Sequence, residues 1–152
     1  MNVHTINSQS ALNIGLKGVE RLVKSFLKWK KVRCHEVMIH FIDKEEITQL
    51  HKEYFQDPTP TDCISFSIDS PNETSHGYSV LGEVFVCPEV AIEYVHENRG
   101  NPYCETTLYI IHGLLHLLGY DDQDDKSRSI MRAQEKSAML YLERNKEILD
   151  AV

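Results

Sequence analysis

The sequence has no long apolar run and no closely spaced cysteine pair, and these absences exclude several classes of protein. No segment approaches the ~18 consecutive apolar residues of a membrane span, so we expect no membrane contact. The first residues, MNVHTINSQS, lack the cationic and apolar stretches of a secretory signal, which predicts a cytoplasmic protein. The cysteines, Cys34, Cys63, Cys87 and Cys104, form no CxxC pair. Reduced thiols are therefore expected, not disulfides or a cysteine metal site.

An excess of positive charge is also missing. The chain has 16 Lys and Arg against 23 Asp and Glu, a formal net charge of −7, which argues against broad nonspecific attraction to nucleic acid. One local basic group remains, and its members are Lys24, Lys28, Lys30, Lys31 and Arg33. This group is interpreted either as a solvated face with cations that favour a helix C-terminus, or as a contact for an RNA backbone.

Alternating strand and helix patterns run through the 152 residues, which we expect to form a single domain, 1–152. Strands are predicted at 2–7, 35–42, 63–68 and 81–87. Helices are predicted at 11–31, 43–55, 88–97, 102–119 and 127–149. The turn-forming segment 69–79 predicts that the last two strands pair antiparallel. The predicted fold is α+β (α/β-like), one mixed four-stranded sheet packed with about five helices, in an order that the pattern does not determine.

The segment HGLLHLLGYDD, residues 112–122, carries the strongest chemical signal. His112 and His116 are four apart on a predicted helix, so both project from one face. Gly119 then lets the chain turn back, which brings Asp121 or Asp122 near the same point. Such a set predicts a metal site with three protein ligands and positions left open for water. Zinc in an open site lowers the pKa of bound water toward ~7.

Two alternatives to a hydrolytic metal site come from the same segment. Histidines on an apolar helix are often ordinary core or surface residues, although a buried histidine needs a partner or a ligand. The spacing also matches the zinc peptidase register HExxH, but Gly113 stands where that chemistry needs its glutamate base. A metallopeptidase is therefore the less favoured reading.

These residues resemble a known family, the bacterial YbeY endoribonucleases. HGLLHLLGYDD closely follows the HGxLHLxGYDH signature of that family, and PTPTDCISF (58–66) is similar to its PTDVLSF segment. LGEVFVCPEVA (81–91) and MRAQE (131–135) match two further segments in the same order. The resemblance implies a single-strand-specific, metal-dependent endoribonuclease that acts in maturation of the small-subunit ribosomal RNA 3′ end and in ribosome quality control. It also implies contact with a ribosomal protein and a ribosome-associated GTPase.

Carried across by position, the resemblance makes His112, His116 and Asp122 the ligands of one Zn²⁺ or another divalent cation per chain. The two histidines would act catalytically through the water that this cation activates. Asp122 departs from the family, which mostly has histidine there, and Asp121 is expected to shape the turn or support the ligands. Phe55 stands where the family has a functional arginine, so Lys52, Arg99 or the basic group of residues 24–33 would have to replace it.

Other residues have expected places in or near the cleft. The resemblance puts Thr61, Asp62 and Ser65 on a cleft wall, whereas turn capping is the alternative reading of the hydroxyls. Glu83 is expected either to support the ligands or to face solvent. The remaining histidines are expected to be structural or surface residues: His4, His35, His40, His51, His76 and His96. A rival function is a ribosome-assembly factor with a structural metal and weakened catalysis, which Phe55 and Asp122 favour.

Overall fold

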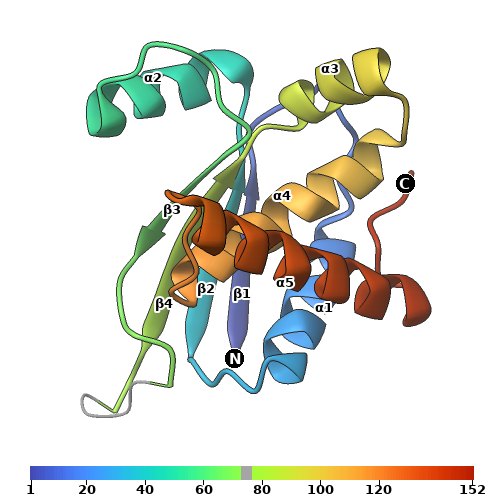
Figure 1. Ribbon diagram of the computed structural model, residues 1–152. Helices are drawn as coiled ribbons and strands as arrows, with labels where there is room; N and C mark the ends of the chain where they lie inside the picture. Colours follow the sequence, from blue (N-terminus) through green and yellow to red (C-terminus); the bar gives the residue numbers. More distant parts are fainter. Residues whose placement is uncertain (73–76) are drawn as a thin grey trace.

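The computed structural model describes residues 1–72 and 77–152, which form four strands and five helices (Figure 1). The strands are β1 (Asn2–Asn7), β2 (Glu36–Phe41), β3 (Cys63–Ser67) and β4 (Val80–Val86). The helices are α1 (Leu16–Trp29), α2 (Lys44–Phe55), α3 (Pro88–Asn98), α4 (Pro102–Leu117) and α5 (Asp125–Arg144). The predicted α+β class with a mixed four-stranded sheet and five helices is confirmed. Part of the predicted turn 69–79, including His76, lies outside the described residues.

The strands form one sheet in the order β1-β2-β4-β3. β1 pairs with β2 and β2 with β4 in parallel, whereas β3 pairs with β4 antiparallel, as predicted. Alternate residues of β2, namely Val37, Ile39 and Phe41, are fully buried, as the two-residue period of a strand requires. The antiparallel β3 ends up at the sheet edge, with Cys63 opposite Val86.

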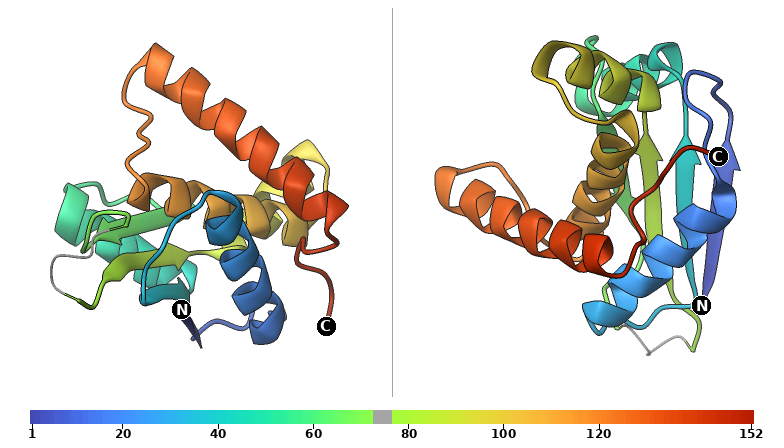
Figure 2. Two further views of the ribbon diagram at one scale, coloured as in Figure 1. Left: turned by 90° about the horizontal axis from the view of Figure 1, so that it is seen from below. Right: turned by 90° about the vertical axis from the view of Figure 1, so that its right-hand side faces the viewer.

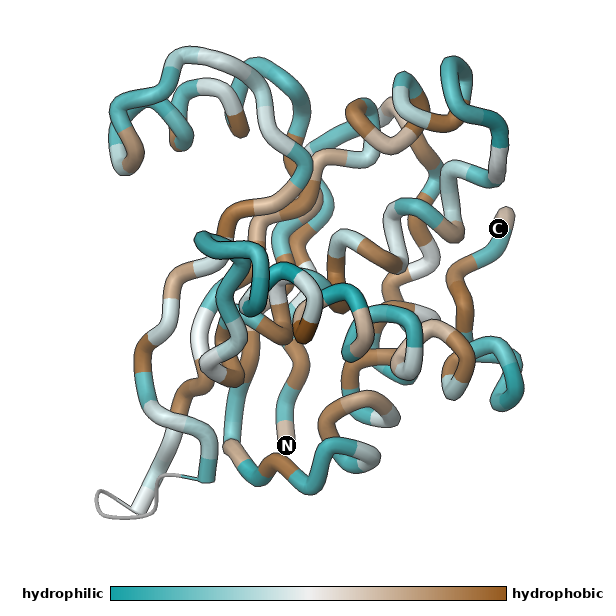
Figure 3. The backbone as a smooth tube through the Cα atoms, viewed as in Figure 1, coloured by the Kyte–Doolittle hydropathy of each residue, from teal (hydrophilic) through white to brown (hydrophobic). Residues whose placement is uncertain are grey.

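Helix α4 lies between the sheet and α5 (Figure 2) and contacts β3, β4, α3 and α5. This position explains why the helix is apolar on nearly every side, since residues such as Ile110, Leu114 and Leu115 are fully buried. By contrast, α2 is drawn largely hydrophilic in Figure 3, and Ile47 is its buried residue. None of the helices in the described part of the chain is long and apolar enough to cross a membrane.

Capping residues fix several helix ends where the sequence predicted them. The Asp43 carboxylate accepts a hydrogen bond of 2.8 Å from the Glu46 amide, and the Asn101 side chain accepts one of 2.8 Å from the Tyr103 amide. Pro102 occupies the first turn of α4, where its missing N–H costs nothing.

The predicted bounds of two helices were wrong. The helix expected at 11–31 begins at Leu16, although Leu12 and Ile14 are buried. Those two side chains enter the core from non-helical chain, which a hydrophobic spacing cannot distinguish from an added turn of helix. The helix expected at 127–149 begins at Asp125 and ends at Arg144. Beyond it, the Leu149 amide donates a 3.1 Å hydrogen bond to the Thr107 hydroxyl, which ties the chain end to α4.

Candidate metal centre

The two histidines of the 112–122 segment lie on the face of α4 that is open to solvent. Their side chains keep 24% and 28% of their surface exposed, whereas Ile111 and Leu115 beside them are fully buried. Packing of the apolar faces of α4 therefore sets the direction in which His112 and His116 point. They are neither core residues nor freely moving surface residues.

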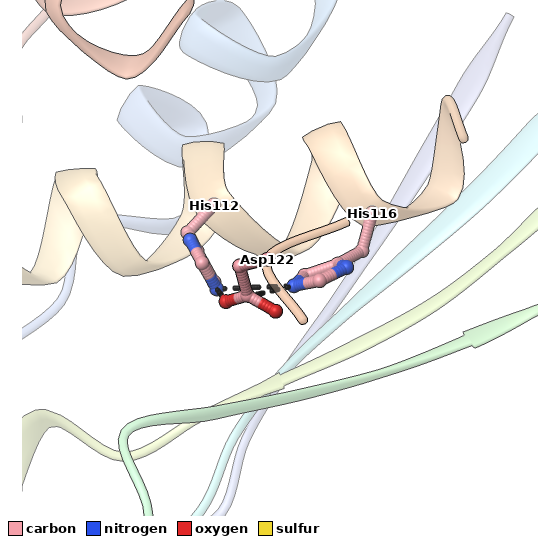
Figure 4. Close-up of side chains that lie close together, drawn as sticks. All are labelled: His112, His116 and Asp122. Carbon is pink, nitrogen blue, oxygen red and sulfur yellow. Dashed lines mark hydrogen bonds and ion pairs between the residues drawn. The ribbon is translucent and has the colours of Figure 1, made fainter. Parts of the chain in front are cut away.

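A tight reversal after α4 brings the third candidate ligand back. Gly119 has φ +99°, a conformation that side-chain-bearing residues rarely adopt, and the Tyr120 amide donates to the Leu115 carbonyl at 3.1 Å. The chain then runs back beside α4, so that Asp122 faces both imidazoles (Figure 4).

The ligand atoms of these three residues converge on one point. The Nε2 atoms of His112 and His116 lie 3.1 Å apart. Asp122 Oδ2 lies 3.5 Å from His112 Nε2 and 3.7 Å from His116 Nε2. Zinc bonds of about 2.0–2.1 Å in tetrahedral geometry place ligand atoms about 3.3 Å from one another. The donor set and its spacing therefore fit a single divalent cation.

A carboxylate from α5 holds the first histidine. Glu135 Oε2 lies 2.7 Å from His112 Nδ1, on the far side of the ring from the converging atoms. An ionised Glu135 accepts a hydrogen bond from the Nδ1–H group, which keeps the proton on Nδ1 and leaves Nε2 free to bind a cation. Burial lowers the pKa of His112, but the hydrogen bond and the charge of Glu135 outweigh it and raise the pKa above its ordinary value.

Burial and neighbouring charge also act on the other groups of the centre. Burial, followed by the adjacent His112, lowers the pKa of His116 and so favours the neutral imidazole that binds metal. Burial raises the pKa of Asp62, an effect that the positive charge of His112 opposes. The centre thus combines a half-buried carboxyl, that of Asp62, with imidazoles of unequal basicity.

Gly113 explains how α4 approaches the sheet so closely. A Cβ at this position would lie 2.4 Å from Val84 Cγ1 and 2.8 Å from Cys63 Sγ, closer than real contacts allow. The residue therefore faces the sheet and not the histidine pair. A side chain at position 113 would point into the sheet, so the base that the HExxH register needs has no place there. This removes the support for the metallopeptidase alternative.

Two cavities flank the cluster and share Asp62, His112 and Asp122 in their walls. We name the first, of about 270 Å³, the arginine cavity; its other walls include Arg128, Arg132 and Glu135. We name the second, of about 410 Å³, the phenylalanine cavity; it is lined in addition by the following residues: His51, Phe55, Thr61, Cys63, Ile64, Ser65, His116, Asp121 and Gln123.

The structure brings most of the predicted cleft residues together. Thr61, Asp62, Ser65 and Asp121 all line the phenylalanine cavity, as does Phe55. Asp121 also accepts a hydrogen bond of 3.3 Å from the Gln123 amide, which fits its expected place in the turn.

Glu83 and the predicted basic residues lie elsewhere. Glu83 lies 3.0 Å from His40 on the neighbouring strand. Among the residues that the structure describes, neither cavity wall contains Lys52, Arg99 or any member of the basic group. Lys30 instead donates to the Tyr120 hydroxyl at 3.0 Å and to the Gln134 side chain. The other members of that group, Lys24, Lys28, Lys31 and Arg33, line a separate surface hollow.

Three functional candidates were not singled out from the sequence. Glu135 is the last residue of the MRAQE segment, and the match of this segment to the family was the signal that could have indicated it. Arg128 and Arg132 sit one turn apart on α5 and line the arginine cavity. Arg128 pairs with Asp125 and donates to the Asp122 carbonyl at 3.3 Å. No pattern in the sequence indicates that α5 crosses over the centre of α4.

Comparisons with known proteins match most of the chain. The family described as Endoribonuclease YbeY matches residues 4–143. An Endoribonuclease YbeY of Protochlamydia amoebophila is 43% identical over 142 residues, 93% of each chain. One from Chlamydia muridarum is 42% identical over 94% of this chain and 89% of its own. The solution structure of TM1509 from Thermotoga maritima has a TM-score of 0.61 at 25% identity and covers 91% of this chain and 87% of its own.

Proposed function

This chain belongs to the YbeY endoribonuclease family, and we propose that residues 1–152 act as one metal-dependent domain that cleaves single-stranded RNA in the cytoplasm. Membership of the family supports a hydrolase that acts on RNA. The dependence on metal is inferred from one observation, the convergence of His112 Nε2, His116 Nε2 and Asp122 Oδ2 at 3.1–3.7 Å. Zn²⁺ is the proposed cation, because two imidazoles and one carboxylate suit it.

The residues around the cluster have separate tasks in this proposal. A zinc ion, when bound, makes hydroxide available near neutral pH and offsets negative charge on phosphate. His112 and His116 hold the cation, and Glu135 keeps His112 in the tautomer that can do so. Arg132, in the wall of the arginine cavity, supplies positive charge for a neighbouring phosphate of the RNA backbone. It takes the place that we expected Lys52, Arg99 or the basic group to fill.

We propose ribosomal RNA as the substrate, with cleavage at the 3′ end of the small-subunit RNA and a part in ribosome quality control. A ribosomal protein and a ribosome-associated GTPase are the proposed protein partners. The resemblance to the family supports these assignments, and the net charge of −7 suits contact with basic ribosomal proteins.

The experiment compares His116→Ala with wild type for zinc content and for cleavage of ribosomal RNA that contains single-stranded segments. We expect the variant to lose stoichiometric zinc and cleavage together, and a chelator to stop the wild type. His96→Ala is the control, since His96 lies exposed on α3, outside both cavities. RNA cleavage that persists after the metal is lost would refute the proposal.

The second candidate function is a ribosome-assembly factor whose metal is structural. Its support is Phe55, which faces the cluster where the family has an arginine and which cannot hold a phosphate. Tight zinc binding without cleavage in Zn²⁺, Mn²⁺ or Mg²⁺ would favour this function over the first.

A further inference from the structure

The two cavities beside the metal cluster differ in chemistry. The arginine cavity has two guanidinium groups, Arg128 and Arg132, in its walls. Among the described residues that line the phenylalanine cavity there is neither lysine nor arginine. Asp62, Asp121 and Asp122 stand in its wall instead. The arginine cavity holds carboxylates too, Glu105 and Glu135 besides the shared Asp62 and Asp122, but its two guanidinium groups offset them in part. With no such cation among its described lining residues, the phenylalanine cavity favours a neutral group over a phosphate.

Phe55 is the large apolar surface of that cavity. Half of the residue, 52%, is exposed. Its ring centroid lies 6.5 Å from that of Phe66, with the two planes inclined at 28°, and 5.8 Å from that of His51. Phe66 in turn meets Phe85 edge-on at 5.8 Å, so the ring is supported from behind. An exposed aromatic ring at the mouth of a polar site offers a stacking surface.

The end of α2 holds this ring in place. Gln56 adopts a left-handed conformation, φ 54°, and its amide donates to the Lys52 carbonyl at 3.0 Å. The amide of Asp57 donates to the His51 carbonyl at 3.3 Å, and His51 Nδ1 lies 2.7 Å from the Thr59 carbonyl oxygen. The helix therefore ends at Phe55 with a fixed reversal, which reduces the freedom that a bound ligand would have to remove.

From this arrangement we infer that the phenylalanine cavity is a subsite for one unpaired RNA base, which stacks on Phe55 while the adjoining phosphodiester lies over the metal cluster. The inference rests on the proposed function. The cavity of about 410 Å³ is within the ordinary range for a small ligand. Thr61, Ser65 and Gln123 line it with groups that can donate to and accept from the edge of a base.

The subsite also gives a physical reason for selecting single strands. A base in a duplex has both faces covered by its neighbours, and its edge is already paired, so it cannot stack on a protein ring without being extruded. An unpaired base can stack on the ring without first losing base stacking and base pairing. The arginine cavity, on the other side of His112, is then left for the neighbouring phosphate.

The test compares Phe55→Leu with wild type, both loaded with zinc, for binding to a short single-stranded RNA by fluorescence anisotropy. Phosphorothioate linkages in this RNA resist hydrolysis, so that it stays intact during the measurement. Leucine keeps most of the apolar packing on Phe66 but has no ring. We expect binding to weaken roughly 5- to 100-fold, the range for loss of one stacked base. RNAs that each carry one abasic nucleotide, at a different position in each, identify the stacked base. At one position the abasic nucleotide should lower the affinity of wild type by the same factor, and should not lower that of Phe55→Leu any further.

Tyr54→Leu is the matched control. Tyr54 is 59% exposed on the same helix and packs edge-on to Phe66 at 5.0 Å, but it does not line the cavity. We expect it to bind RNA as wild type does. Equal affinity of Phe55→Leu and wild type for RNA would overturn the subsite. So would an abasic nucleotide that lowers the affinity of wild type equally at every position.

The outcome for cleavage is separate. A wild type that binds RNA and loses affinity with Phe55→Leu, yet cuts no RNA with any divalent cation, overturns the proposed nuclease but keeps the subsite. A wild type that binds no single-stranded RNA overturns both.

Discussion

Glu135 Oε2 lies 2.7 Å from His112 Nδ1, so a side chain of α5 orients a candidate metal ligand of α4. The side chain of Glu135 is 17% exposed, which shields this contact from water. The centre is consequently not a property of the 112–122 segment alone. It depends on how α5 packs across α4.

Removal of this carboxylate should weaken metal binding without removing a ligand. We expect Glu135→Ala to lower zinc affinity about 10- to 100-fold, because the imidazole loses the partner that fixes its tautomer and orientation. The zinc affinity of Glu135→Gln, whose side chain can still accept a hydrogen bond, should lie between those of wild type and Glu135→Ala. Competition with a coloured chelator measures the affinities. Glu143→Ala, at an exposed position of the same helix, should bind zinc as wild type does.

Replacement of the acidic ligand should change which cation is preferred. We expect Asp122→His to raise the preference for Zn²⁺ over Mn²⁺, because an imidazole replaces a hard, anionic oxygen donor. Dissociation constants for both ions, measured by calorimetry, test this. Asp121→His should leave the preference unchanged, since Asp121 is not among the three converging ligands. Unchanged selectivity in Asp122→His would argue against Asp122 as a ligand.

A methyl group at Gly113 should destabilise the fold. Gly113→Ala brings Cβ within 2.4 Å of Val84 Cγ1, and overpacking of this kind costs about 1–3 kcal/mol of unfolding free energy. Urea unfolding measures the loss. Gly18→Ala is the control: its Cβ would meet Leu149 at an ordinary 3.5 Å, so higher helix propensity should stabilise the chain by up to about 1 kcal/mol.

One surface carboxylate should contribute a specific dependence on pH. Asp57 accepts hydrogen bonds from the Thr59 hydroxyl at 2.5 Å and the Thr59 amide at 3.0 Å, and these lower its pKa below the ordinary 3.8. A carboxyl with a lowered pKa stabilises the fold fully above its ordinary value and loses this contribution as pH falls through the lowered one. Asp57→Asn does not titrate. Urea unfolding across pH measures the unfolding free energies of the variant and of wild type. The variant's unfolding free energy should be lower by a constant amount near neutrality, and this difference should shrink below pH 3.8.

The elements that the sequence predicted well are those with a local physical signal. The caps at Asp43 and Asn101 and the stop at Gly119 depend on nearest neighbours in the chain. The histidine pair is equally local, since four residues of helix bring the two rings to one face.

Contacts between distant segments could not be predicted in this way. Strand order, the crossing of α5 over α4 and the burial of Leu12 outside a helix depend on tertiary packing. Arg132 carries no local signal of its place in a cavity wall, because it is one of several charged residues on an amphipathic helix. The match of the MRAQE segment indicated Glu135, but its role in orienting His112 follows only from the distance between the two side chains.

All three converging side chains, the candidate metal ligands, come from residues 112–122. A cation bound there closes only a short stretch of chain, so it restricts the unfolded ensemble little. The sheet and the large core lie elsewhere and hold α4 in place by their own packing. The ion should therefore come and go while the chain stays folded, in contrast to a zinc finger, whose fold exists only with its metal.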